Sequence, residues 1–138
     1  MKAHVFTYGS LMYAPVWNMV ASGFYQKSPA TLKNFVRRAV INQEYPVVLP
    51  HKDSVGVQGV VYFDVNGPDI RRLDEFEGIY YIRKREPVIL ENLKTIHAEV
   101  YILNDTYRSI ASDKEWDQSH FEAFGITHFL TNYDGFSR

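Results

Sequence analysis

Two short stretches of this sequence carry side chains that could act together on a small molecule. The first is Tyr8-Gly9-Ser10-Leu11, which follows an apolar strand pattern and leads into a helix start. Gly9 can adopt a positive φ angle, so the backbone can turn sharply there and direct consecutive N–H groups at a small anionic group. The ring of Tyr8 could form one wall of a binding pocket, and Ser10 supplies a hydroxyl group. A strand followed by Gly-Ser is more often a simple turn, so this stretch needs support from elsewhere in the chain.

The second stretch is residues 69–77, a predicted helix that ends at Gly78. Three apolar side chains define its buried face: Ile70, Leu73 and Phe76. At about 100° per residue, Glu77 falls inside that face, Asp74 lies on its margin and Glu75 points away from it. An unpaired carboxylate is costly to bury, so Glu77 is expected either to gain a partner or to have a raised pKa.

Glu77 also has a purely structural interpretation. It stands in the last turn of the predicted helix, where the backbone often departs from ideal geometry and a side chain can reach water. Tyr80, Tyr81 or Arg83 could also bind it through a hydrogen bond or a salt bridge. If Glu77 instead faces a pocket, Tyr81 and Arg83 are candidates to line that pocket, together with Tyr45.

The composition limits the classes of protein to which the chain can belong. With 138 residues, of which 46% are hydrophobic, residues 1–138 are expected to form a single domain around one core. A net charge of −1 predicts no nucleic-acid partner, and the basic clusters at 37–38, 71–72 and 83–85 are more simply explained as solvated faces. The absence of cysteine excludes disulfides, thiolate metal sites and a cysteine nucleophile.

Other kinds of catalytic or targeting sequence have little support. His97 and Glu99 share one strand face, but without a third ligand they do not predict a metal site. Ser10 lacks the flanking GxSxG pattern of a triad hydrolase. The N-terminus resembles no signal peptide, and no apolar run approaches the ~20 residues that span a bilayer. We therefore expect a cytoplasmic protein with no membrane partner and no metal.

The elements that must position these residues follow from the hydrophobic pattern. Besides the strand before Tyr8, strands are predicted at residues 31–41, 45–50, 55–65, 80–90 and 97–103. The prolines that bracket the second of these favour an edge position. The last two form a hairpin through Asn92-Leu93-Lys94, and Gly56 and Gly59 mark a bulge or the close approach of another backbone.

Helices are predicted between the strands and in the C-terminal part. A short helix begins at Pro15 and ends before Gly23, and Asn66-Gly67-Pro68 is expected to be a turn. Two capping boxes, Ser112-x-x-Glu115 and Ser119-x-x-Glu122, each predict a helix start. An aromatic stripe is expected to pack against the sheet: Trp116, Phe121, Phe124 and Phe129.

Taken in order, these motifs resemble the γ-glutamylcyclotransferase and AIG2-like family over nearly the whole chain. The matching pieces are Tyr8-Gly9-Ser10-Leu11-Met12 with Pro15-Val16-Trp17, Tyr45-Pro46, residues 57–62, residues 73–78 with 80–83, residues 98–101, and residues 115–117 with Phe121 and Phe124. Each piece alone is a weak signal. The order and spacing of YGSL and FEG together are specific.

The resemblance implies a fold of the α+β type, with a small mixed β-barrel of about five to six strands flanked by short helices. It also implies a substrate cavity at the loop of Tyr8, Gly9, Ser10 and Leu11, and Glu77 as general acid/base without a cofactor. In cyclotransferases of this kind, the α-amine of a γ-glutamyl compound attacks its own γ-carbonyl and releases 5-oxoproline and an amine or peptide. We expect a small γ-glutamyl molecule as the partner, and a monomer or a weak homodimer.

The residues themselves suit this reaction. A carboxylate with a raised pKa can take a proton from the α-ammonium and later protonate the leaving amine. The N–H groups of Gly9 to Leu11 could hold the α-carboxylate or stabilise the oxyanion, and both roles stay open. Two alternatives also stay open: a non-catalytic module that binds a small molecule or a protein in the same cavity, and an amidohydrolase that would need an activated water. Glu77 favours the cyclotransferase, because a binding module gains little from a carboxylate on an apolar face.

Overall fold

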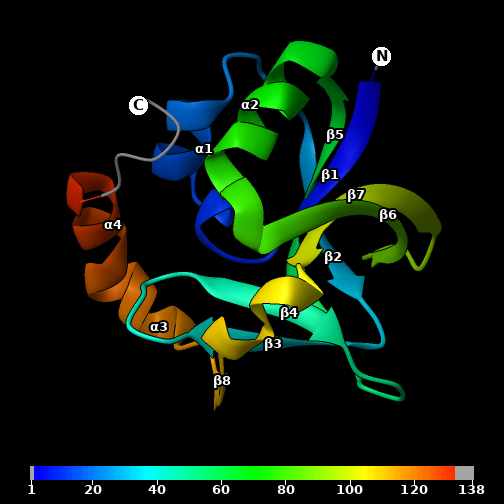
Figure 1. Ribbon diagram of the computed structural model, residues 1–138. Coiled ribbons are helices and arrows are strands. Elements are labelled where there is room, and N and C mark those ends of the chain that lie inside the picture. The colour runs from blue at the N-terminus through cyan, green and yellow to red at the C-terminus, as the bar shows by residue number, and fades with distance from the viewer. Residues whose placement is uncertain (1, 133–138) are drawn as a thin grey trace.

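The computed structural model describes residues 2–132, and a closed five-stranded barrel forms its centre (Figure 1). The barrel strands are β1 (Lys2–Thr7), β2 (Lys27–Leu32), β5 (Val57–Asn66), β6 (Tyr81–Leu90) and β7 (Thr95–Leu103), in the order β1-β5-β2-β6-β7. β1 runs parallel to β7, whereas the other neighbouring strands are antiparallel. The predicted small mixed barrel is therefore confirmed.

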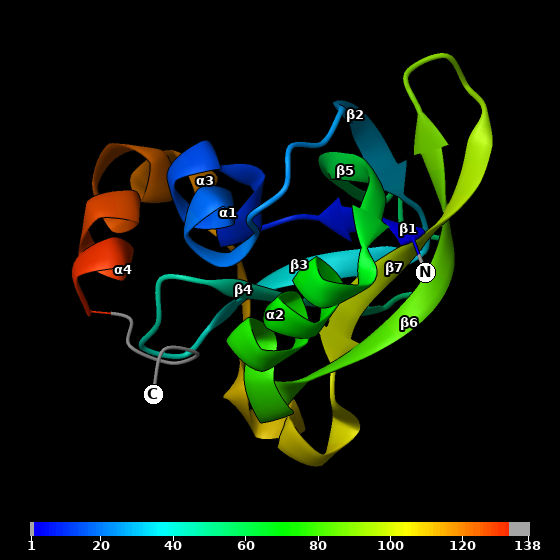
Figure 2. The same cartoon turned by 90° about the horizontal axis from the view of Figure 1, so that it is seen from above.

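The strands of the barrel are paired to very different extents. β6 and β7 pair through nine residue pairs, from Tyr81↔Leu103 to Ile89↔Thr95. β2 and β6 pair only at Ala30↔Leu90 and Thr31↔Ile89. The contact between β2 and β6 is therefore a short seam, and the β6–β7 hairpin extends beyond it at one side of the molecule (Figure 2).

A second sheet of three strands lies below the barrel in Figure 1. Its strands are β3 (Phe35–Val40), β4 (Pro46–Pro50) and β8 (Ala111–Glu115), in the order β4-β3-β8. β4 lies at the edge, as its prolines predicted. The single strand predicted at 31–41 is wrong, because the backbone reverses at Asn34 with φ = +64° and the chain passes from the barrel to the second sheet.

Four α-helices accompany the two sheets in the described part of the chain: α1 (Ala14–Val20), α2 (Gly67–Glu77), α3 (Gln118–His120) and α4 (Ile126–Asn132). A π-helical turn, Phe121–Gly125, joins α3 to α4, and 3₁₀ turns occur at Ser10–Met12, Gly78–Tyr80 and Asp105–Ile110. Figure 2 shows α3 and α4 beside α1, on the side of the molecule opposite the β6–β7 hairpin. No helix within residues 2–132 is long and apolar enough to cross a membrane.

Helix α2 presents the face that its sequence predicted. Its apolar residues are buried: Ile70, Leu73 and Phe76. It starts earlier than expected, because the side chain of Asn66 accepts a hydrogen bond from the Asp69 N–H (2.8 Å) and caps the helix. The helix ends where Gly78 takes φ = +74°.

The core joins the barrel to α1 and α2. The indole of Trp17 in α1 stacks on the Tyr62 ring of β5, with ring centroids 3.6 Å apart. Within the barrel, a Cβ atom at Gly59 would lie 2.1 Å from the carbonyl oxygen of Thr7. The prediction that another backbone comes close to this glycine is confirmed, and only glycine lets β1 reach its observed distance from β5.

The C-terminal part differs from its prediction in three respects. Ser112 starts no helix: its hydroxyl donates to the Ala39 carbonyl (2.7 Å) and ties β8 to β3. The following helix is capped by Asp117, which accepts from the His120 N–H (2.9 Å), so Ser119 is not its cap. The aromatic stripe packs as predicted at its other positions, but Phe124 is 67% exposed.

Candidate active site

A cavity of about 330 Å³ opens between the end of β1, the start of β4 and the C-terminal end of α2. Its walls include residues 8–11, Tyr45 and Pro46, residues 75–81, Tyr101 and Phe129. The cavity therefore brings together Tyr8, Gly9, Ser10, Leu11, Glu77, Tyr45 and Tyr81, all of which were candidates from the sequence. Loop 8–11 and Glu77, which lie more than 60 positions apart in the sequence, thus face one space.

Glu77 lies on the cavity wall and is half-buried. Burial and, to a smaller extent, the negative charge of Asp74 together raise its pKa from an ordinary 4.5 to about 8. None of residues 2–132 donates a hydrogen bond to this carboxyl group or forms an ion pair with it. The group is therefore free to exchange a proton with a bound molecule near neutral pH.

The other two acids of this helix have different surroundings. Asp74, one turn before Glu77, accepts hydrogen bonds from Arg83 Nε (2.9 Å) and from the Tyr101 hydroxyl (2.7 Å). Glu75 is exposed to solvent, although it too borders the cavity. The helical geometry thus gives three neighbouring carboxylates three environments, and only that of Glu77 suits proton transfer.

Arg83 lies outside the cavity, so its predicted place in the pocket is wrong. Its guanidinium pairs with Asp74 and, through Nη1, with Glu99 (2.6 Å). Arg83 follows Tyr81 by two positions on β6, which carries it about 7 Å along the strand from the cavity. It therefore meets Asp74, one turn back along α2, rather than Glu77.

Gly9 shapes the loop for a reason that differs from the predicted one. Its φ angle is −138°, so no left-handed conformation is involved. A Cβ atom at this position would lie 2.7 Å from Cδ of Pro46, at the start of β4. Glycine is required here because the edge strand of the second sheet packs directly against the loop.

The backbone of the loop presents hydrogen-bond donors. In the 3₁₀ turn Ser10–Met12, Met12 N donates to the Gly9 carbonyl (3.1 Å) and Tyr13 N donates to the Ser10 carbonyl (3.2 Å). Among the described residues, no group accepts from the N–H groups of Gly9, Ser10 or Leu11. Because these residues line the cavity, their N–H groups can bind an anionic oxygen there.

Arg37 supports this loop from outside the cavity, a role that the sequence did not reveal. Its Nη1 donates to the Tyr8 carbonyl (2.7 Å), its Nη2 donates to Gln118 Oε1 (3.3 Å), and its guanidinium carbon lies 5.1 Å from the centre of the Trp116 ring. In a trans peptide the C=O and N–H groups point in opposite directions, so fixing the Tyr8 carbonyl also fixes the Gly9 N–H. The prediction that Arg37 belongs to a solvated face is wrong.

Tyr8 and Tyr101, on the cavity wall, keep their protons. The Tyr8 hydroxyl donates to the Tyr101 carbonyl (2.6 Å), and the Tyr81 hydroxyl donates to the Pro46 carbonyl (2.9 Å). Burial, together with the nearby Glu77, raises the pKa of Tyr8 well above its usual value. Burial and the hydrogen bond to Asp74 raise the pKa of Tyr101. These side chains therefore shape the cavity and do not compete with Glu77 as proton acceptors.

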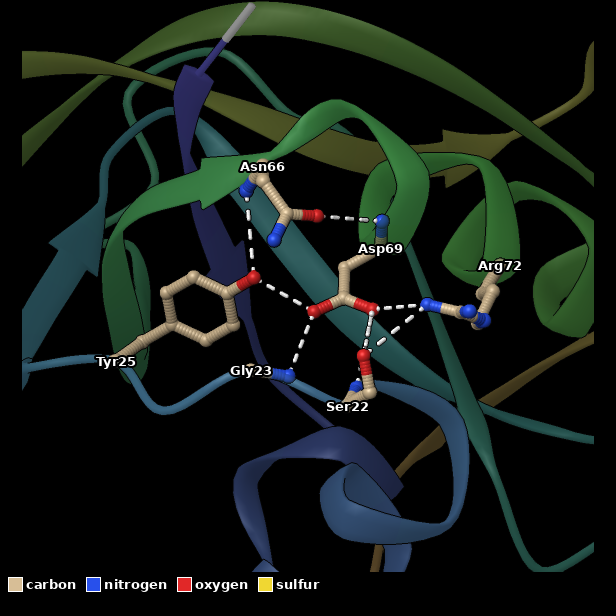
Figure 3. A network of polar contacts seen from close by, with 6 residues as sticks. All are labelled: Ser22, Gly23, Tyr25, Asn66, Asp69 and Arg72. Carbon is tan, nitrogen blue, oxygen red and sulfur yellow. Dashed lines mark hydrogen bonds and ion pairs between the residues drawn. The ribbon is translucent and has the colours of Figure 1, made fainter.

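A buried carboxylate that the sequence did not predict holds α2 in place (Figure 3). Asp69 is fully buried and accepts from the N–H (3.0 Å) and hydroxyl (3.3 Å) of Ser22, the N–H of Gly23 (3.0 Å), the hydroxyl of Tyr25 (2.6 Å) and Nη1 of Arg72 (2.6 Å). Burial alone would raise the pKa of Asp69, but these hydrogen bonds lower it to about 2. The network fastens the start of α2 to the segment after α1. One signal in the sequence could have indicated this helix start: Asn66, three residues before Asp69, is a residue type typical of a helix N-cap.

The described part of the chain offers no grouping of ligands for a metal. Within residues 2–132, no three histidine, cysteine, aspartate or glutamate side chains come together. The carboxylate of Glu99, which shares a strand face with His97, is bound to Arg83.

Known proteins resemble the chain in sequence and in fold. AIG2-like protein D of Arabidopsis thaliana is 32% identical over 130 residues, which cover 87% of this chain and 82% of that protein. AIG2-like protein C of the same plant is 31% identical and covers 92% and 73%. A solved Arabidopsis thaliana structure matches with a TM-score of 0.72 and 23% identity over 94% of this chain and 87% of the other. A solved gamma-glutamyl cyclotransferase matches with a TM-score of 0.64 and 19% identity over 75% and 68%, which shows the shared fold.

The family itself follows from the sequence match. Residues 5–118 fit the family described as "Gamma-glutamyl cyclotransferase, AIG2-like". This range includes the loop of residues 8–11, the helix that carries Glu77, and Arg37. The chain therefore belongs to the gamma-glutamyl cyclotransferase, AIG2-like family.

Proposed function

We propose that this protein is a γ-glutamylcyclotransferase-type enzyme that converts the γ-glutamyl group of a small γ-glutamyl amine or peptide into 5-oxoproline. The observation that carries the proposal is the Glu77 carboxyl group, with a pKa of about 8, on the wall of a cavity that also presents the N–H groups of residues 9–11. Membership of the family supports an enzyme of this general type.

The raised pKa of Glu77 favours the proton transfer that the reaction needs. It brings the carboxyl group closer to the pKa of an α-ammonium group than an ordinary carboxylate would be, so moving the proton to Glu77 costs less free energy. The freed amine then attacks the γ-carbon of the same molecule and forms a C–N bond. Because nucleophile and carbonyl belong to one chain, a cavity that holds the chain folded supplies much of the rate enhancement.

The second half of the reaction breaks the bond to the leaving amine. Glu77, now protonated, gives its proton to the leaving nitrogen as the original C–N bond breaks. Of the three protons on the α-ammonium, one stays on the lactam nitrogen and two end on the released amine, which leaves as an ammonium ion. The N–H groups of Gly9, Ser10 and Leu11 bind either the α-carboxylate or the oxyanion at the γ-carbon.

The test is incubation of the purified protein with a panel of γ-glutamyl compounds, followed by an assay for 5-oxoproline. We expect release from at least one compound. Glu77→Gln should lower kcat by ~10²- to 10⁴-fold, the usual effect of removing a proton-transferring group. Glu75→Gln, on the exposed side of the same helix, is the matched control and should change little.

Two results would contradict the proposal in different ways. Binding of γ-glutamyl compounds without any 5-oxoproline would indicate the alternative, a non-catalytic module that keeps the cavity. Turnover by Glu77→Gln within a few-fold of the parent would show that another group transfers the proton. A cytoplasmic location and a monomeric or weakly dimeric state stay predictions, for fractionation and sedimentation to test.

A further inference from the structure

A second hollow, here called the outer hollow, adjoins the cavity. It has a volume of about 290 Å³ and shares Tyr45 and Tyr80 with the cavity. Its remaining lining comes from the end of β3, the β3–β4 connection and the 3₁₀ turn Asp105–Ile110: Val40, Ile41, Gln43, Ser109 and Ile110. Tyr45 and Tyr80 thus border both spaces.

The walls of the outer hollow are held by backbone hydrogen bonds. Ile41 N donates to the Ile110 carbonyl (2.9 Å), which joins the two segments across the hollow. Asn104 N donates to the Tyr80 carbonyl (2.8 Å), and the Tyr80 ring meets the Tyr107 ring edge-on at 5.0 Å. The hollow is therefore formed before any ligand binds.

The chemistry of these walls selects the kind of group that can enter. Among the described residues that line the hollow, none carries a charge, and the polar groups are the Gln43 amide, the Ser109 hydroxyl and the two tyrosine hydroxyls. Ile41 exposes 51% of its surface, and Ile79, on the cavity wall next to Tyr80, exposes 66%. A charged group would lose water there without gaining a counter-charge, whereas an apolar group would cover these side chains.

We propose that the outer hollow receives the leaving-amine portion of the substrate, and that this portion is an uncharged aliphatic or aromatic group rather than an amino acid or peptide with a free carboxylate. The inference rests on the proposed cyclotransferase function. The γ-glutamyl group occupies the cavity beside Glu77, and the substituent on its γ-nitrogen passes Tyr45 and Tyr80. Ile41 is then a specificity-determining residue.

The experiment compares leaving groups that differ in charge. The purified protein is given γ-glutamyl-benzylamide, γ-glutamyl-isobutylamide, γ-glutamyl-glycine and γ-glutamyl-glutamate, and kcat/KM for 5-oxoproline release is measured. We expect the two apolar amides to exceed the two charged compounds by about tenfold or more, as apolar pockets usually discriminate. Ile41→Lys should shrink or invert this ratio. Val55→Lys is the matched control, since Val55 is 91% exposed and lines neither hollow, and it should keep the ratio.

A binding measurement separates this inference from the proposed function. NMR spectra of isoleucine methyl groups are recorded during titration with γ-glutamyl-benzylamide and γ-glutamyl-glycine, with Ile96 as the internal reference.

Release of 5-oxoproline with no preference for apolar amides, or with a preference that Ile41→Lys leaves intact, overturns the outer-hollow assignment and leaves the function standing. If no compound yields 5-oxoproline, the function fails and the methyl signals decide. Saturable shifts of Ile41 and Ile110 with the benzylamide alone support the hollow as an apolar subsite, and their absence, or equal shifts with γ-glutamyl-glycine, overturns it.

Discussion

At the scale of the residue, Glu77 is useful in the site and unfavourable for the fold. Folding moves this carboxyl group from water to the wall of a cavity, where its charged form is disfavoured. Between pH 4.5 and about pH 8 the folded protein therefore binds a proton at Glu77 that the unfolded chain does not bind. The contribution of Glu77 to the free energy of unfolding is therefore fully present below pH 4.5, and it decreases as the pH rises to about 8.

This linkage predicts an unusual phenotype for Glu77→Gln. The amide carries no charge at any pH, so the variant should have a higher Tm than the parent at pH 8 to 9 and a similar Tm at pH 4.5. Thermal unfolding followed by circular dichroism across this range measures the effect. Glu75→Gln should show no such pH-dependent gain, and a parent as stable as Glu77→Gln at pH 9 would mean that the carboxyl group is well hydrated.

Arg37 provides a second prediction at this scale. Arg37→Met keeps much of the side-chain volume on Trp116 but removes the hydrogen bond to the Tyr8 carbonyl, so the Gly9 N–H loses its fixed direction. We expect KM for a γ-glutamyl substrate to rise, with a loss of about 1–3 kcal/mol in stability from the unpaired carbonyl. Steady-state kinetics and urea unfolding separate the two effects. Arg38→Met, the neighbouring position, is the control, and equal kinetics for the two variants would argue against a positioning role for Arg37.

At the scale of the element, α2 depends on one buried carboxylate at its start. Asp69 links the helix to Ser22, Gly23 and Tyr25, which come from the segment after α1. Since Glu77 stands at the other end of this helix, the orientation of the candidate acid/base depends on a network about two turns away.

Asp69→Asn should therefore destabilise the protein. The amide offers one acceptor oxygen where the carboxylate offered two, and its NH₂ group faces donors, so a loss of about 1–3 kcal/mol is expected. The depressed pKa of Asp69 adds a pH signature: its contribution is complete above the ordinary value of 3.8 and is lost as the pH falls toward 2. Urea unfolding at pH 7 and at pH 2.5 should show a large difference between parent and variant at the first pH and a smaller one at the second. A difference that does not depend on pH would count against the ionised network.

The elements that were predicted correctly are those whose signal lies within their own stretch of sequence. The face of α2, the edge position of β4 and the β6–β7 hairpin follow from local spacing and from proline and turn residues. The prediction of one strand at 31–41 failed because apolar residues occur on both sides of Asn34. The segments before and after Asn34 pair in different sheets. Ser112 failed as a helix cap because its hydroxyl found a partner in β3, 73 positions away in the sequence.

At the scale of the whole molecule, the candidate site is an assembly of distant segments. Loop 8–11 and Glu77 could be identified from the sequence because each carries its own local signal. The supports of that loop could not be identified, because Pro46 and Arg37 act from the second sheet and their contacts exist only when the two sheets meet. Asp69 was missed for the same reason, since all of its donors except Arg72 lie 44 to 47 positions away.

The short seam between β2 and β6 is the place where the barrel can open locally. Two residue pairs close it, against nine between β6 and β7, so thermal opening should start there. Along β6, backbone amides directed at β7 should resist deuterium exchange, and those on the opposite edge of the strand, which meets β2 only at Ile89 and Leu90, should exchange rapidly. Residue-resolved NMR would show this alternation, and uniform protection of β6 would argue against it. None of the contacts described around Glu77 joins β2 to β6. The barrel can therefore open between these two strands while loop 8–11, the end of α2 and the cavity keep their shape.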